Sequence, residues 1–444
     1  MENDSKAAAE RPVQAAPSSR EASYTLAVLT LIYVFYYADR TVLSLLLDSI
    51  KKDFQVTDAT MGLITGFGFV LFYSFLGLPI ARLADRFDRR FILTAGLALW
   101  SVMTCFSGLA GSAWQLAVTR FGVGAGESCG IAPAHSMLSD LFPKDKLPGA
   151  ISILTAGSPV GIFVGSLLAG FVNQHYGWRA AFFAAGLPGI AVAILFRFTV
   201  KEPARGAMEE RKASMSLLSV AQTALFLLRQ RSFVFITIGG SLMGITVYGF
   251  GGWTPAFLHR IHHLSSAQIG AYHGMVSGIF GVAGVLLGGV LAEKLGTRDV
   301  RWRVYVPALA CIVCSPMYLL FLFMRSVAGA LLWLCVATIC MSAYLGPVYA
   351  LYQTVSKVRM RAVASATFLF FGNVIGLGIG SWMIGKLADE LRPHFGDEAI
   401  RYSLIVPSLL ALVAGALIWA ASRDIVQDMA TAAAPDPAAG SGER

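Results

Sequence analysis

Residues 25–47 read TLAVLTLIYVFYYADRTVLSLLL, an apolar run interrupted by one acid–base pair, Asp39 and Arg40. A helix over residues 24–50 would be about 40 Å long at ~1.5 Å per residue, which is enough to cross a bilayer. Asp39 would then lie near the bilayer midplane, where a charged side chain costs at least ~2.5–3.5 kcal/mol. Charges at that depth face a bundle interior or an aqueous cavity and mark ion or substrate pathways. The alternative is a structural pair that only holds helices together.

The composition of the 444-residue chain is that of a membrane protein. Hydrophobic residues make up 56% of it, charged residues 14%, and the mean hydropathy is +0.65. Soluble proteins of this length do not normally show such values. We predict an all-α, polytopic membrane protein, because twelve apolar segments are near or above the ~20 residues that a spanning helix needs. These spans are residues 24–48, 59–83, 91–110, 113–140, 147–173, 179–199, 233–258, 267–293, 303–324, 327–352, 361–388 and 400–422.

The segments outside these spans are predicted to be tails and a linker. Residues 1–22 are small and polar and lack a cleavable signal pattern, so we predict a disordered tail there and a second one over residues 425–444. Residues 201–231 change from charged to amphipathic, which indicates a linker that ends in an interfacial helix. The two halves of the chain are then residues 23–200 and residues 232–424.

The distribution of Lys and Arg orients the predicted helices. If both termini are cytoplasmic, the cytoplasmic segments hold 25 of these residues and the opposite side holds 8. This is the positive-inside bias, so we predict cytoplasmic termini and, from the short loops, a bacterial inner-membrane protein. The same distribution accounts for the net charge of +9 without a nucleic-acid partner.

No catalytic or metal-binding pattern is evident in the sequence. All six cysteines fall in apolar spans, and Cys311 and Cys314 lack a nearby His or second Cys pair. Packed thiols are therefore favoured over a metal site or a disulfide. The chain has no Gly-x-x-x-x-Gly-Lys-Ser/Thr motif, so ATP is not the expected energy source. We expect a monomer without enzyme activity, cofactor or metal.

Two helix ends six spans apart carry similar charges, which indicates an internal repeat of two six-helix halves. The first reads Ala81-x-x-x-Asp85-Arg86-x-Asp88-Arg89-Arg90. It resembles the loop signature G-x-x-x-D-R-x-G-R-R of the major facilitator superfamily, with Ala81 and Asp88 at the two glycine positions. The resemblance implies a gating loop; a loop that only follows the positive-inside rule is the alternative. The gating residues would be Asp85, Arg86, Arg89 and Arg90, with Glu293 and Lys294 in the second copy.

The fourth span adds two intramembrane charges, Arg120 and Glu127. They are seven residues apart and so share one helix face. If helices 1 and 4 are neighbours, as in that superfamily, these charges converge with Asp39 and Arg40 and sum to zero. Apolar burial raises the pKa of a carboxylic acid and an adjacent guanidinium lowers it, so a carboxylate between these effects can titrate in a useful range. Proton coupling requires a carboxylate that titrates in such a range.

The C-terminal half has no intramembrane acid that mirrors Asp39, and its candidate positions are aromatic or neutral. We favour His273 as an interhelical hydrogen-bonding residue over a proton relay. His135 lies two turns past Glu127 and is expected to share its face. The candidate cavity-lining residues of both halves are Tyr37, His135, Tyr248, Trp253, His273, Tyr344 and Asn373.

Within the superfamily, the chain resembles the spinster-type transporters of sphingosine-1-phosphate and lysophospholipids, as a bacterial homologue. The resemblance lies in YADRTV at residues 37–42, DRFDRR at 85–90, GAGES at 124–128, IAP at 131–133 and DLF at 140–142. It implies that Asp39 and Glu127 are protonatable groups. It also implies that Arg40 and Arg120 are their charge partners or contact the substrate headgroup.

Three functions remain open at this stage. The first is a proton-coupled secondary active transporter of an anionic amphiphile by alternating access, with the headgroup beside Arg40 or Arg120 and the tail along the apolar C-terminal half. The second is a proton symporter of a small organic anion such as a sugar acid, which should need more polar groups in that half. The third is a lipid sensor that binds without transport. The expected partners are the amphiphile, protons and membrane lipids.

Overall fold

The computed structural model describes residues 19–84, 86–143, 145–205, 220–357 and 360–433. The N-terminal half contains α1 (Ser19–Phe54), α2 (Asp58–Thr65), α3 (Phe67–Ala84), α4 (Arg89–Gly108), α5 (Ala113–Glu127), α6 (Ile131–Leu141) and α7 (Leu147–Thr199). The linker contains α8 (Val220–Arg229).

The C-terminal half begins with α9 (Arg231–His262), α10 (Ser266–Met275), the π-helical η1 (Val276–Phe280), α11 (Gly281–Gly296) and α12 (Trp302–Phe323). It continues with α13 (Val327–Ala343), α14 (Leu345–Thr354), α15 (Arg361–Phe371), the π-helical η3 (Gly372–Ile379) and α16 (Gly380–Phe395). The 3₁₀ turns η4 (Gly396–Glu398) and η5 (Ala421–Arg423) flank α17 (Ala399–Ala420), and α18 (Ile425–Ala433) follows.

Every predicted span falls on helix in the structure. In the described part of the chain, nine continuous helical stretches are long and apolar enough to cross a membrane. Two of these stretches, residues 147–199 and 363–423, each contain two predicted spans, and the remaining span is divided between α5 and α6. The predicted all-α, polytopic fold is confirmed.

Spans four, five and six differ locally from the prediction. Spans five and six form one element, α7, in which the backbone turns at Gly177, whose φ of 83° favours glycine. The fourth span, predicted as one helix, is interrupted at residues 128–130. Glu127 is therefore the last residue of α5, and His135 follows on a separate helix, so helical spacing no longer places these two residues on one face.

The glycines of α7 fix the position of the central stretch of α1. Gly157, Gly161 and Gly165 recur every fourth residue along the face that packs against α1. A Cβ atom at Gly161 would lie 3.0 Å from Tyr37 Cβ, and one at Gly165 would lie 2.6 Å from Ala38 Cα. Small residues at this spacing let two helix backbones approach closely. They hold the residues beside Asp39 against α7.

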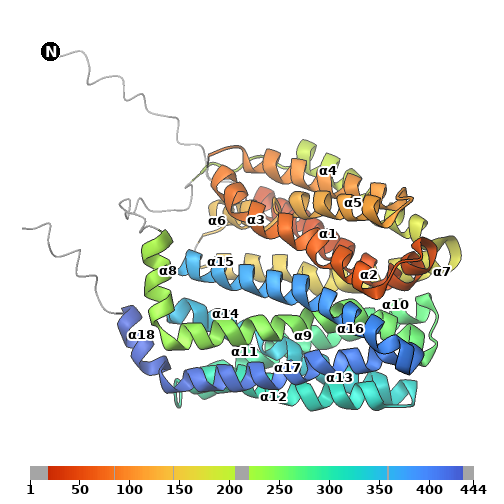
Figure 1. The fold of residues 1–444 in the computed structure, drawn as a ribbon. Helices are drawn as coiled ribbons and strands as arrows, with labels where there is room; N and C mark the ends of the chain where they lie inside the picture. The colour runs from red at the N-terminus through yellow and green to blue at the C-terminus, as the bar shows by residue number, and fades with distance from the viewer. Residues whose placement is uncertain (1–18, 85, 144, 206–219, 358–359, 434–444) are drawn as a thin grey trace, which may run out of the picture.

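The two halves lie side by side in the bundle (Figure 1). The helices α8 and α18 lie at one end, which we call the α8 end, and α2 begins at the other, which we call the α2 end. The halves pack on each other through α1 with α9, α2 with α16, α3 with η3 and α7 with α10.

The structure moves the boundaries of the predicted tails. Helix α1 begins at Ser19, and α18 extends to Ala433, where a disordered tail was predicted from residue 425. The α18 helix is anchored because Asp428 Oδ2 accepts hydrogen bonds from the Ser232 backbone N–H at 2.9 Å and from Ser232 Oγ at 2.5 Å. The other predicted tail residues, 1–18 and 434–444, and linker residues 206–219 lie outside the described part.

Candidate functional site

The central contact of the candidate site joins Arg40 on α1 to Glu127 at the end of α5. Arg40 Nε donates a hydrogen bond to Glu127 Oε2 at 2.6 Å, and Arg40 Nη2 donates to Tyr36 Oη at 2.5 Å. The Glu127 side chain is fully buried, and its Oε1 has no hydrogen-bond partner among the described residues. Buried polar atoms normally form hydrogen bonds. Because this oxygen forms none, it can accept a proton or a hydrogen bond from a ligand.

Aromatic rings surround the Arg40 guanidinium. Its Cζ lies 4.4 Å from the ring centroid of Tyr36, 4.7 Å from that of Phe69 and 4.6 Å from that of Tyr73. The Tyr36 hydroxyl donates to the Tyr73 hydroxyl at 3.0 Å, which links α1 to α3. Such rings attract a cation through their faces, while the N–H groups of a guanidinium stay available in its own plane. The Arg40 side chain is 21% exposed, so a ligand can reach it.

Asp39 is held separately from the Arg40–Glu127 pair. The Thr104 hydroxyl on α4 lies 2.9 Å from Asp39 Oδ1 and 2.8 Å from Oδ2, and it donates to the carboxylate. Asp39 is buried, and it forms no ion pair with any described residue. The structure therefore does not contain a direct Asp39–Arg40 pair, which was the structural alternative for this stretch.

Arg120 is the fourth charge and is also buried. Its Nη2 donates to Ser107 Oγ at 2.9 Å, its Cζ lies 5.4 Å from the ring centroid of Phe182, and its Nε has no hydrogen-bond partner in the described part of the chain. The four charges thus come from α1 and α5, with hydroxyl partners on α4. Only Arg40 and Glu127 are in direct contact.

The predicted cavity residues of the C-terminal half separate into two groups. Tyr248 on α9 donates to Asn373 Oδ1 on η3 at 2.8 Å. By contrast, Trp253 and Tyr344 are buried in the core of their half, and Trp253 Nε1 donates to the Ser381 carbonyl at 3.2 Å. Core packing, rather than a cavity wall, therefore accounts for these two residues.

Two histidines and a tyrosine complete the predicted set. His273 Nδ1 lies 3.3 Å from Ser166 Oγ, and this contact joins α10 to α7 across the two halves. It fits the interhelical role that the sequence favoured. His135 is half-buried on α6, and its Nε2 has no partner among the described residues. Tyr37 is half-buried, and its ring centroid lies 5.9 Å from Arg40 Cζ.

The predicted gating residues that the structure describes do not form one cluster. Arg89 is buried and donates to Asp140 Oδ2 at 2.5 Å and to Glu202 Oε1 at 2.7 Å, so it ties α4 to α6 and to the segment after α7. Arg90 Nη1 donates to the Val200 carbonyl at 3.2 Å. The residues Arg86, Glu293 and Lys294 are exposed, and Asp85 lies outside the described part. The Glu202 contact was missed because Glu202 was read as part of a linker.

A network that the sequence reasoning missed joins the halves at the α2 end. Arg260 on α9 donates to Asp48 Oδ1 on α1 through Nε at 3.0 Å and Nη2 at 2.5 Å. It also donates to Asp58 through Nη1 and Nη2, both at 2.8 Å, and Lys51 Nζ lies 2.7 Å from Asp58 Oδ1. Asp389 on α16 accepts from the Asp58 and Ala59 N–H groups, whose positions at the start of α2 leave them without intrahelical partners.

The fold and these buried charges are those of a membrane transporter, and the chain belongs to the Major Facilitator Superfamily, whose family model matches residues 29–381. It is a spinster-type member of that superfamily, as its relatives indicate. An MFS-type efflux pump of Mycolicibacterium smegmatis is 31% identical over 92% of this chain and 95% of its own length. Protein spinster homolog 3 of Danio rerio is 26% identical over 93% of this chain and 87% of its own.

Solved structures agree with this assignment. A bacterial homologue of the human lysosomal transporter Spinster, in an inward-facing and unoccupied conformation, superposes with a TM-score of 0.84 at 27% identity. The match covers 93% of this chain and 99% of that one. A D-xylose–proton symporter, with a TM-score of 0.70 and 16% identity, shares the fold. The resemblance inferred from the sequence motifs is therefore confirmed.

Proposed function

We propose that this protein is a proton-coupled secondary active transporter of an anionic amphiphile, such as a lysophospholipid or a sphingosine-1-phosphate-like lipid. The observation that carries the proposal is the Arg40–Glu127 contact, in which a reachable guanidinium is bound to a carboxylate whose second oxygen is buried and unpartnered. Arginine suits a phosphate or carboxylate headgroup because its planar N–H groups can bond two oxygens at once.

Competition between the substrate headgroup and Glu127 for Arg40 would couple substrate binding to proton uptake. A bound headgroup takes hydrogen bonds that Arg40 otherwise donates to Glu127 and Tyr36. The Glu127 carboxylate, buried and without its counter-charge, then takes up a proton. When Glu127 loses this proton, it pairs with Arg40 again and the headgroup leaves. Asp39 is a second protonatable group, and Arg120 is a second cation for the headgroup.

In alternating access, the central site would open first at one end of the bundle and then at the other. The network around Arg260 closes the α2 end. If both termini are cytoplasmic in an inner membrane, as we infer from the positive charges, the closed α2 end is the outer one and the site opens inward. The similarity to spinster structures in inward-facing conformations, with TM-scores of 0.84 and 0.81, supports this arrangement. The halves then rock about the central site in a single monomer.

The scarcity of free polar groups beside the site favours an amphiphile over a small organic anion. Among the described residues of the C-terminal half, the predicted partners near the site are Tyr248 and Asn373, which already bond each other. A sugar acid would need further polar partners for its hydroxyl groups.

The test is transport by the full chain in proteoliposomes under imposed pH gradients. A labelled lysophospholipid and a labelled sugar acid would be compared for the parent protein, Glu127→Gln and the control Asp145→Asn, which changes an exposed acid. We expect gradient-driven lysophospholipid transport by the parent and the control, with coupling lost in Glu127→Gln. Gradient-driven transport of the sugar acid alone would contradict the proposed substrate, and lipid binding without flux would indicate a sensor.

A further inference from the structure

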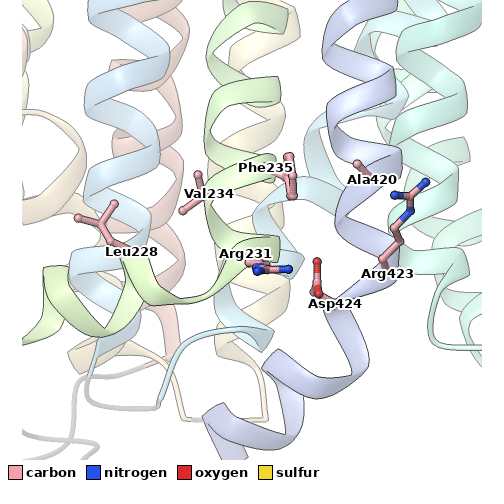
Figure 2. A pocket seen from close by; sticks show the side chains of 7 residues that line it. All are labelled: Leu228, Arg231, Val234, Phe235, Ala420, Arg423 and Asp424. Atoms are coloured by element: carbon pink, nitrogen blue, oxygen red, sulfur yellow. The ribbon is translucent and has the colours of Figure 1, made fainter.

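A groove of about 480 Å³ opens at the α8 end of the C-terminal half, away from the Arg40–Glu127 site. It lies between the α8–α9 junction on one side and the end of α17 with η5 on the other (Figure 2). The residues that line it are Leu228, Arg231, Val234, Phe235, Ala420, Arg423 and Asp424. Neither the central site nor the network around Arg260 uses these residues.

The groove has a charged part and an apolar part. Arg231, Arg423 and Asp424 supply the charges, and Figure 2 shows Arg231 and Asp424 extending toward the same space from α9 and from the end of η5. No ion pair joins these side chains in the described structure, so two opposite charges share the groove without neutralising each other. The next acid along the chain, Asp428, is already bound to Ser232.

The position of the groove matches the headgroup layer of a membrane. It lies at the ends of α9 and α17, both of which belong to stretches that can span a bilayer. Beside it, Leu228 on α8 is 65% exposed, and Val234, Phe235 and Ala420 continue the apolar wall along the spanning helices. A lipid seated there would place its glycerol and the first part of its acyl chains on these side chains and its headgroup among the charges.

We propose that this groove binds a phospholipid whose headgroup carries both a phosphodiester and a primary ammonium group, as in phosphatidylethanolamine. The phosphodiester would accept hydrogen bonds from Arg231, with Arg423 adding positive charge, and the ammonium would donate to Asp424. The charges of groove and ligand are then complementary at both positions. A purely anionic headgroup would satisfy the arginines but would place negative charge beside Asp424. Free phosphate would leave the apolar wall exposed.

Native mass spectrometry of the detergent-solubilised full chain can test this assignment. Phosphatidylethanolamine, phosphatidylglycerol and phosphatidylcholine with the same acyl chains would be titrated separately. We expect the parent to bind phosphatidylethanolamine most tightly, because the quaternary ammonium of phosphatidylcholine cannot donate a hydrogen bond to Asp424. Arg231→Gln should weaken phosphatidylethanolamine binding by roughly tenfold or more, the value of one charge-assisted hydrogen bond. The control Arg301→Gln changes an exposed arginine outside the groove and should bind like the parent.

A second variant distinguishes the contribution of the acid to lipid binding from that of the arginine. Asp424→Asn removes the partner of the ammonium and should abolish the preference for phosphatidylethanolamine over phosphatidylglycerol without weakening the binding of phosphatidylglycerol. Thermal unfolding in lipid-free detergent checks that both variants fold, and we expect parent-like transitions because neither side chain forms an ion pair in the groove. Equal or tighter binding of phosphatidylglycerol by the parent would overturn the proposal. Unchanged lipid selectivity in both folded variants would overturn it as well.

Discussion

Replacement of Arg260 by glutamine should open the α2 end of the bundle. The Arg260 guanidinium donates four hydrogen bonds to two carboxylates of the other half, Asp48 and Asp58. Loss of one partner of a buried ion pair costs ~3–5 kcal/mol. The Arg260 side chain is 12% exposed and that of Asp48 is 21% exposed, so we reduce the cost for solvent screening to about 2–3 kcal/mol.

This cost falls on the closed state, because the three side chains would be hydrated once the halves separate at this end. The ratio of open to closed molecules should therefore rise by roughly 30–150-fold. Lys51 remains beside Asp58 in the variant and keeps part of the negative charge neutralised. An open state that is about 1% populated in the parent would rise to roughly 20–60% in the variant.

Pulsed electron paramagnetic resonance can measure this shift. Spin labels would be placed by Lys52→Cys and His394→Cys, two exposed positions in different halves at the α2 end, in a background without the native cysteines. We expect a longer distance component in Arg260→Gln. The matched control is Arg179→Gln, because Arg179 pairs with Asp53 at 2.7 Å within one half. An unchanged distance distribution in Arg260→Gln, or the same change in the control, would refute the reasoning.

Three further predictions concern packing, the buried network on α4 and the site. Gly161→Ala should destabilise the protein by about 1–3 kcal/mol in thermal unfolding because it overpacks the contact with α1, whereas Gly149→Ala, in open space on the same helix, should be neutral or stabilising. Arg89→Ala should lower the unfolding free energy by about 3–5 kcal/mol, and the exposed Lys201→Gln should not lower it measurably. Arg40→Lys keeps the charge but loses the planar donors, so the KM for lysophospholipid transport should rise roughly tenfold; an unchanged KM would argue against headgroup binding there.

Local properties of the sequence were enough to predict the helices. Each span is defined by its own apolar length, so the twelve spans could be placed without knowledge of their neighbours. The loop motif around residues 85–90 and the helix 1 motif also identified the superfamily and its spinster branch before any fold was known. These inferences depend on residues close together in the chain.

Contacts between distant residues could not be predicted in the same way. The sequence placed Arg40 near both Asp39 and Glu127 but did not indicate which acid it binds. In the structure Arg40 binds Glu127, the last residue of α5. In the sequence, Arg260 is one basic residue of a predicted outer loop. Its ion pairs could not be predicted because its acid partners lie about two hundred positions earlier. The α18 helix was missed because its stability depends on the Ser232–Asp428 contact.

The most direct test of the central claim is proton uptake on substrate binding. A lysophospholipid with a phosphate headgroup would be added to the detergent-solubilised parent and to Glu127→Gln in weak buffer, while the pH change and the bound lipid are both recorded. We predict that the parent takes up protons as the headgroup displaces Glu127 from Arg40, and that Glu127→Gln binds the lipid with little or no proton uptake. Equal proton uptake by both proteins, or lipid binding by the parent without any, would contradict the proposed coupling.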